Sequence, residues 1–124
     1  METRMHYPRL TSSILGLLLL TLSTSASAAR IFVVSADEWA RPRSGDVIVE
    51  FDALRAAVGF WGKQDDALIV VRYPGEDSGE LWASELRDWL ISLGVPSDYI
   101  RLVAGTQAAD EIRLLVGNRD ELEQ

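Results

Sequence analysis

A short apolar run near the N-terminus limits how much of this chain can form a folded domain. The run extends from Ile14 to Leu22, follows two arginines, and leads into small residues at 23–29. This order of basic, apolar and small residues is typical of a cleavable secretory signal peptide, with cleavage expected after Ala28. The run is shorter than the roughly 20 residues needed to cross about 30 Å of hydrocarbon. We therefore expect residues 1–28 to be removed on export, the alternative being an uncleaved N-terminal anchor.

The remaining chain is acidic and contains no cysteine. The predicted leader carries two of the twelve Lys and Arg residues and one of the nineteen acids, which leaves ten cations, eighteen anions and a net charge of −8. This charge repels phosphate, so we expect neither nucleic-acid binding nor insertion into a membrane after cleavage. Without cysteine the domain can form no disulfide and no thiolate metal site. About 96 residues therefore have to bury one core without covalent help.

Hydrophobic periodicity predicts strands that alternate with helices. Strands are expected at 30–35, 47–51, 67–71, 100–103 and 111–116. A helical turn at 36–39 should be capped by Ser35, and a longer helix should begin with Asp52 as its N-cap. The clearest helix is predicted at 81–93, where Gly94 follows as a left-handed C-terminal residue.

These elements predict the α/β class, with a mixed β-sheet and two main helices packed on it. The chain order gives a β-α-β-α-β core, because helices alternate with the strands that they connect. We expect a single domain at 29–117 and an acidic tail at 118–124.

The residue types that most often perform catalysis are scarce in the predicted domain. It contains no cysteine, and the single histidine of the chain, His6, lies in the leader. A Ser-His-Asp triad, a Cys-His pair and an imidazole zinc site are therefore excluded for residues 29–124. The acids around Ser78 could hold calcium, but acids in this position also complement the positive end of a helix. We expect no catalytic residue, no cofactor and no metal site.

Two segments are the best candidates for contacts with a partner. Trp39 lies beside Arg41 and Arg43 and is the tryptophan most expected to be exposed, because the other three fall on predicted core faces. The second segment is the loop from Tyr73 to Gly79, which connects a strand to a helix. It occupies the position of a phosphate-binding loop, but its acids would repel phosphate and it lacks the Gly-Lys-Ser/Thr ending.

The segment from Tyr73 to Ser97 resembles a family of small exported proteins. The resemblance centres on the block RYPG…WASELRDWLISLGVPS and covers most of the chain after the leader. Proteins of that family are encoded within integrating conjugative elements, among genes for a type IV secretion apparatus. The resemblance implies a periplasmic accessory protein of conjugative transfer without established enzymatic activity. Its partners would be other proteins of the secretion apparatus.

The predicted architecture is also similar to that of OmpA-like peptidoglycan-binding domains. Those domains hold the diaminopimelate of peptidoglycan with an aspartate in a loop and an arginine on the following helix. Asp77 and Arg87 are the nearest residues to these positions, although neither has the spacing of that motif. Peptidoglycan binding is therefore the alternative function, and Trp39, Tyr73, Asp77 and Arg87 are the candidate contact residues. A small hydrolase is a third and weaker hypothesis.

Overall fold

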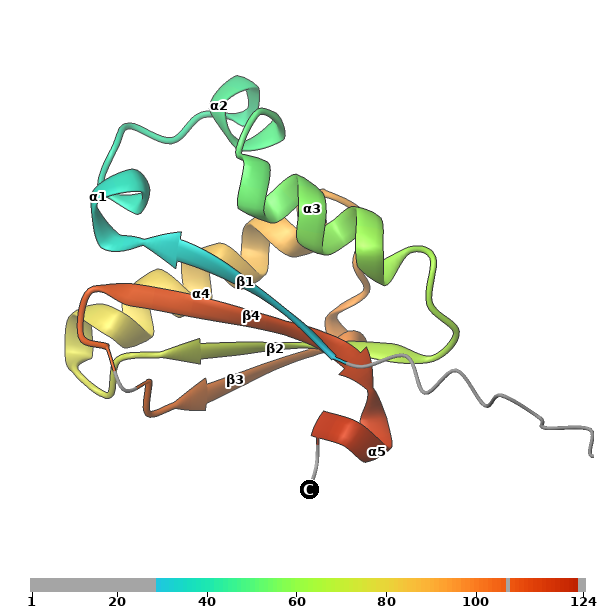
Figure 1. Ribbon diagram of the computed structural model, residues 1–124. Coiled ribbons are helices and arrows are strands. Elements are labelled where there is room, and N and C mark those ends of the chain that lie inside the picture. The colour runs from blue at the N-terminus through green and yellow to red at the C-terminus, as the bar shows by residue number, and fades with distance from the viewer. Residues whose placement is uncertain (1–28, 107, 123–124) are drawn as a thin grey trace, which may run out of the picture.

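The computed structural model describes residues 29–106 and 108–122, and the predicted leader lies outside them. The described chain contains four strands and several helices (Figure 1). They follow in the order β1 (Arg30–Ser35), α1 (Ala36–Trp39), α2 (Gly45–Val49), α3 (Asp52–Trp61), β2 (Ala67–Tyr73), α4 (Asp77–Ser92), η1 (Ser97–Tyr99), β3 (Ile100–Ala104), β4 (Glu111–Asn118) and α5 (Arg119–Leu122).

The four strands form one mixed sheet with the order β1-β4-β2-β3. β4 is antiparallel to both β1 and β2, whereas β2 and β3 are parallel. Parallel strands require a crossover connection, and α4 provides it between β2 and β3. The predicted α/β fold with a mixed sheet and two main helices is confirmed.

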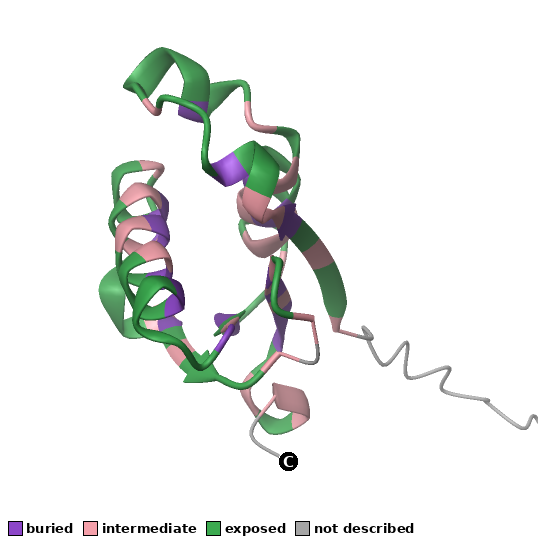
Figure 2. Ribbon diagram, turned by 90° about the vertical axis from the view of Figure 1, so that its left-hand side faces the viewer, coloured by how far each residue is buried: buried purple, intermediate pink, exposed green. Residues whose placement is uncertain are grey.

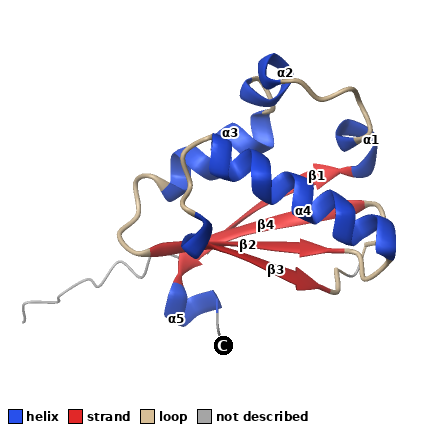
Figure 3. Cartoon of the chain, turned by 180° about the vertical axis from the view of Figure 1, so that it is seen from behind, coloured by secondary structure: helices blue, strands red, loops and turns tan. Residues whose placement is uncertain are grey.

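Both long helices cover the same face of the sheet. α3 packs against β1 and β4, while α4 packs against β2 and β3. Figure 3 shows the two helices together in front of the sheet, and Figure 2 shows the same layers from the side. The core between these layers is formed by fifteen buried residues: Val34, Trp39, Ile48, Leu54, Ala57, Ile69, Val71, Ala83, Leu86, Leu90, Val95, Ile100, Ile112, Leu114 and Val116.

Helix α4 is confirmed, but it begins at Asp77, four residues before the predicted start at Leu81. Its first turn contains Gly79, at which an added Cβ would collide with the carbonyl oxygen of Pro74. The glycine therefore permits a close approach of helix and loop, which a sequence pattern does not reveal. At the other end Gly94 has a φ of +107°, as expected for the residue that terminates the helix.

The strand predicted at 47–51 is wrong. Gly45–Val49 forms the short helix α2, in which the amide of Ile48 donates to the carbonyl of Ser44. A run of β-branched residues favours a strand by propensity, but burial of Ile48 in the core determines the conformation here. Asp52 is also not the N-cap of α3, since Phe51 occupies that position and Asp52 belongs to the first turn.

The predicted N-terminal helix cap is found in the structure, whereas the C-terminal strand extends beyond its predicted end. The Ser35 hydroxyl accepts a hydrogen bond from the amide of Glu38 at 3.2 Å, so its predicted capping of α1 is confirmed. The last strand continues to Asn118, and residues 119–122 form the helical turn α5. Figure 1 shows α5 at the end of the sheet from which β4 emerges.

Candidate functional site

The face of the sheet opposite α3 and α4 is the candidate site, because among the helices that the structure describes only α5 covers part of it (Figure 2). Alternation along each strand places side chains on this face at every second position. We call this surface the open sheet face, and it consists of Ile31, Val33, Val70, Arg72, Arg101, Val103, Arg113 and Leu115, with Ser35 and Glu111 continuing the alternation at one end.

The strand register arranges these side chains in two rows across the sheet. Ile31 pairs with Leu115, Leu115 with Val70, and Val70 with Arg101. This first row is apolar except at the β3 edge. In the second row Val33 and Val103 occupy the two edge strands, and arginines occupy the two central strands.

Three apolar side chains on the open sheet face remain in contact with solvent, whereas Val70 at its centre is buried. Ile31 is 57% exposed, Val33 45% and Val103 39%. Large apolar side chains that are exposed singly are ordinary, but here Ile31 and Val33 adjoin the half-buried Leu115, while Val103 lies at the opposite edge beyond the two arginines. A grouped apolar surface with a polar surround is typical of a protein contact site.

Arg72 and Arg113 lie directly opposite each other on β2 and β4. Like charges in this relationship destabilise a sheet. Arg113 is partly compensated, because its Nε donates to Oε1 of Glu111 at 2.6 Å. The Arg72 side chain is exposed and makes no hydrogen bond or ion pair with any described residue. The centre of the open sheet face thus carries positive charge that the described part of the domain only partly neutralises.

Helix α5 closes one end of this face. It packs against β4 and β2, and Leu68 beneath it is fully buried. A Cβ added to Gly117 would lie 2.8 Å from the Cβ of Ala29 and 3.1 Å from Oε2 of Glu121. The glycine therefore allows α5 and the start of β1 to approach the sheet closely, and the open area begins beyond them.

Trp39 is not exposed, contrary to the sequence-based expectation. Its side chain is 1% exposed and belongs to the core. The guanidinium of Arg43 lies 4.6 Å from the Trp39 ring centroid, and the ring of Phe51 meets Trp39 edge-on at 5.9 Å. Arginine and aromatic neighbours cover the ring, so Trp39 offers no surface to a partner. The sequence did not indicate that Arg43 would cover it.

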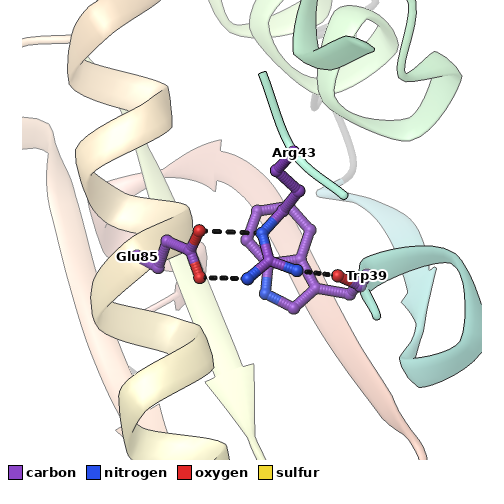
Figure 4. A network of polar contacts seen from close by, with 3 residues as sticks. All are labelled: Trp39, Arg43 and Glu85. Carbon is purple, nitrogen blue, oxygen red and sulfur yellow. Dashed lines mark hydrogen bonds and ion pairs between the residues drawn. The ribbon is translucent and has the colours of Figure 1, made fainter. Parts of the chain in front are cut away.

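Arg43 also ties the segment after α1 to α4 (Figure 4). Its Nε and Nη2 donate to the two carboxylate oxygens of Glu85 at 2.7 and 2.5 Å, and its Nη1 donates to the Trp39 carbonyl. The Arg43 hydrogen bond is the main cause that lowers the pKa of Glu85 below its ordinary value of 4.5, while burial opposes it. This network stabilises the fold and is separate from the open sheet face.

The Tyr73–Gly79 loop is held against the domain. The carbonyl of Tyr73 accepts hydrogen bonds from the amides of Gly105 at 2.8 Å and Thr106 at 3.3 Å. The Tyr73 ring packs against the core, and Pro74 is buried. The loop is therefore a fixed connection between β2 and α4 rather than a freely projecting arm.

Asp77 and Arg87 are not brought together. Both belong to α4, Asp77 as its first residue. Ten residues of α-helix span about 15 Å along the axis, and the two positions differ by about 80° around it. They therefore do not form one small-ligand site of the kind inferred from the OmpA-like resemblance.

The described residues contain no group of three His, Cys, Asp or Glu side chains arranged to hold a metal ion. Within the same part of the chain no helix has the length and apolar character required to cross a membrane. The sequence matches no protein-family model and no curated protein. The open sheet face was missed by sequence reasoning, although the alternation in 111–116 and the isolated Arg72 in an apolar strand were visible signals.

Proposed function

We propose that this chain is an exported, non-enzymatic binding protein that holds an acidic, partly apolar segment of another protein on its open sheet face. The single observation that carries the proposal is the facing pair Arg72 and Arg113, set between exposed valines. The absence of cysteine from the sequence, with its one histidine in the predicted leader, supports a binding rather than a catalytic role.

Apolar contact would supply most of the binding free energy. Removing apolar surface from water contributes about 25 cal/mol per Å². Ile31, Val33 and Val103 are already held in a sheet, so little side-chain entropy is lost when they are covered. A partner segment with two or three apolar side chains in alternation would match the spacing of this surface.

Charge complementarity determines which apolar segment fits. The whole chain has a net charge of −7, but the open sheet face contributes Arg72, Arg101 and Arg113. A carboxylate from the partner, placed between Arg72 and Arg113, would relieve their repulsion and accept charge-assisted hydrogen bonds. A basic segment would be repelled at the same position, so the surface selects an acidic partner.

The sequence resemblance to exported proteins of integrating conjugative elements supports a more specific proposal. The partner would be another periplasmic component of a type IV secretion apparatus, and the chain would act as an accessory protein of conjugative transfer. Peptidoglycan binding remains the competing outcome, which the same set of experiments distinguishes.

Photo-crosslinking in the source organism tests this function. A photoreactive amino acid is placed at Val33 on the open sheet face and, as a matched control, at Leu81, which is 72% exposed on α4. The proposal expects one dominant crosslinked protein from Val33 and none of it from Leu81. That protein should carry an acidic, partly apolar segment at the crosslinked position.

Several results would contradict the proposal. Equal crosslinking from Val33 and Leu81 would mean that the open sheet face has no special role. A crosslink to a second copy of the chain would mean that the open sheet face mediates self-association and does not bind another protein. Specific retention of the purified protein on peptidoglycan, abolished by Asp77→Ala but unaffected by Val33→Asp, would establish the alternative function.

A further inference from the structure

We infer a second binding site, for a small organic anion with an aromatic or other apolar body, in a groove between β1 and α3. The groove has a volume of about 450 Å³. This volume is in the range of sites that hold small molecules, roughly 300–1,000 Å³. We call it the basic groove, and the side chains and backbone that matter to its chemistry are Arg30, Phe32, Arg55, Gly59, Phe60 and Lys63.

The periodicities of the two elements bring these residues together. Arg30 and Phe32 are two positions apart on β1 and therefore share one face of the strand. Arg55, Gly59 and Lys63 recur every four residues along α3 and its C-terminal extension, so they follow one side of the helix. The groove lies on the helix-covered side of the sheet and does not overlap the open sheet face.

Positive charge in the basic groove is not neutralised by the described residues. Arg30, Arg55 and Lys63 line it, and no described Asp or Glu does so. The side chains of Arg55 and Lys63 make no hydrogen bond or ion pair with any described residue. In a chain of net charge −7, three cations gathered in one groove concentrate anions there.

Two aromatic rings give the basic groove an apolar wall. Phe32 and Phe60 have ring centroids 6.2 Å apart. The guanidinium of Arg30 lies 4.5 Å from the Phe60 centroid, so its charge is held against that ring. A ligand with a flat apolar body could contact the rings while its carboxylate, phosphate or sulfonate meets the cations.

Gly59 leaves the helix side of the basic groove without a side chain. Glycine inside a helix costs about 1 kcal/mol relative to alanine. Gly59 does not have the positive φ that would require glycine, and a Cβ added to it would meet nothing within 4 Å. A larger side chain at this position would extend into the groove, whereas glycine leaves the helix backbone accessible there.

The test uses two fluorescent probes that share one ring system. 1-Anilinonaphthalene-8-sulfonate is anionic, and N-phenyl-1-naphthylamine is the same molecule without the sulfonate. The full chain is expressed with its own leader, purified from the exported fraction and titrated with each probe. We expect the sulfonate to bind at least tenfold more tightly than the neutral probe. Its binding should shift backbone NMR signals of residues 55–63 and of β1.

Variants localise the site and keep the proposal falsifiable. Arg55→Ala and Lys63→Ala should each weaken sulfonate binding about tenfold, as expected for loss of a charge-assisted contact. Gly59→Leu should abolish binding, while Gly59→Ala verifies that the helix tolerates a side chain. Arg41→Ala and Val33→Asp are controls that should leave binding unchanged. Equal affinity for both probes would overturn the proposal of the basic groove. Loss of sulfonate binding in Val33→Asp together with its retention in Gly59→Leu would do the same. Neither result would affect the proposed partner surface.

Discussion

Arg43 and Glu85 are 42 residues apart in sequence and meet through two parallel hydrogen bonds of 2.7 and 2.5 Å. The pair connects the irregular segment between α1 and α2 to the centre of α4 (Figure 4). Because Arg43 also covers the Trp39 ring, it joins an ion pair to the packing of the core. The pair therefore has consequences for stability that can be measured.

Arg43→Ala should destabilise the domain. The substitution leaves Glu85 without its bidentate partner and uncovers Trp39. The two side chains are 20% and 39% exposed, so solvent screens part of the attraction. We expect a loss of about 1–2 kcal/mol in the free energy of unfolding. Urea unfolding followed by tryptophan fluorescence measures it, with Arg41→Ala as the control. Identical unfolding of Arg43→Ala and the original protein would show that the network is not stabilising.

The contribution of Glu85 to the free energy of unfolding should decrease as the pH falls. Its pKa is lowered in the folded protein, mainly by the Arg43 hydrogen bond. A lowered folded-state pKa gives stability that is fully present above the ordinary value of 4.5 and is lost as the pH falls through the folded value. The difference in unfolding free energy between the original protein and Glu85→Gln should therefore be larger at pH 7 than below pH 4. A difference that stays constant over this range would contradict the assignment.

Gly79 and Gly59 should respond in opposite ways to alanine. At Gly79 a Cβ would collide with the backbone of Pro74, whereas at Gly59 it would enter open space. We expect Gly79→Ala to lower the free energy of unfolding by about 2–4 kcal/mol, because backbone atoms have to shift. Gly59→Ala should raise it by about 0.5–1 kcal/mol through helix propensity. Thermal unfolding of both variants measures these changes, and equal effects would contradict the packing described for the loop and α4.

Replacing Arg72 should leave the fold as stable or slightly more stable, and it should weaken partner binding. Arg72 faces Arg113 across the sheet and has no partner among the described residues. Arg72→Gln removes the repulsion, so the free energy of unfolding should stay unchanged or rise by about 0.5 kcal/mol. The variant should nevertheless bind the crosslinked partner at least fivefold more weakly. A marked loss of stability in Arg72→Gln would mean that the arginine is a structural residue instead.

Much of the fold could be predicted from the sequence because its core elements have strong local signals. The apolar run 67–71 and the stripe on the 81–93 segment indicated the central strand and the main helix, and both are present. Residues 47–51 could not be assigned correctly, because the β-branched run favours a strand while the tertiary position of Ile48 imposes a helix. Trp39 is buried because it packs into a core formed by residues distant in sequence, and Arg43, four positions further on, then covers its ring.

The candidate site was less predictable than the fold. A face of a sheet is assembled from strands distant in sequence, and its composition depends on their order. Arg72 and Arg113 become neighbours only because β4 inserts between β1 and β2. Reading the strands one by one shows alternation, but it does not show which alternating positions meet. The open sheet face therefore required the register of the structure.

The most direct test of the proposed function is the affinity of the protein crosslinked at Val33 for purified variants of this chain. We predict that Arg72→Glu, which reverses the charge at the centre of the open sheet face, weakens binding at least tenfold at low salt. Binding of this protein to the original chain should weaken as salt is raised, because added salt shortens the Debye length below its value of about 8–10 Å at physiological ionic strength. Leu81→Asp, on α4, should bind like the original protein. Unchanged affinity in Arg72→Glu, or an equal loss in Leu81→Asp, would contradict the account.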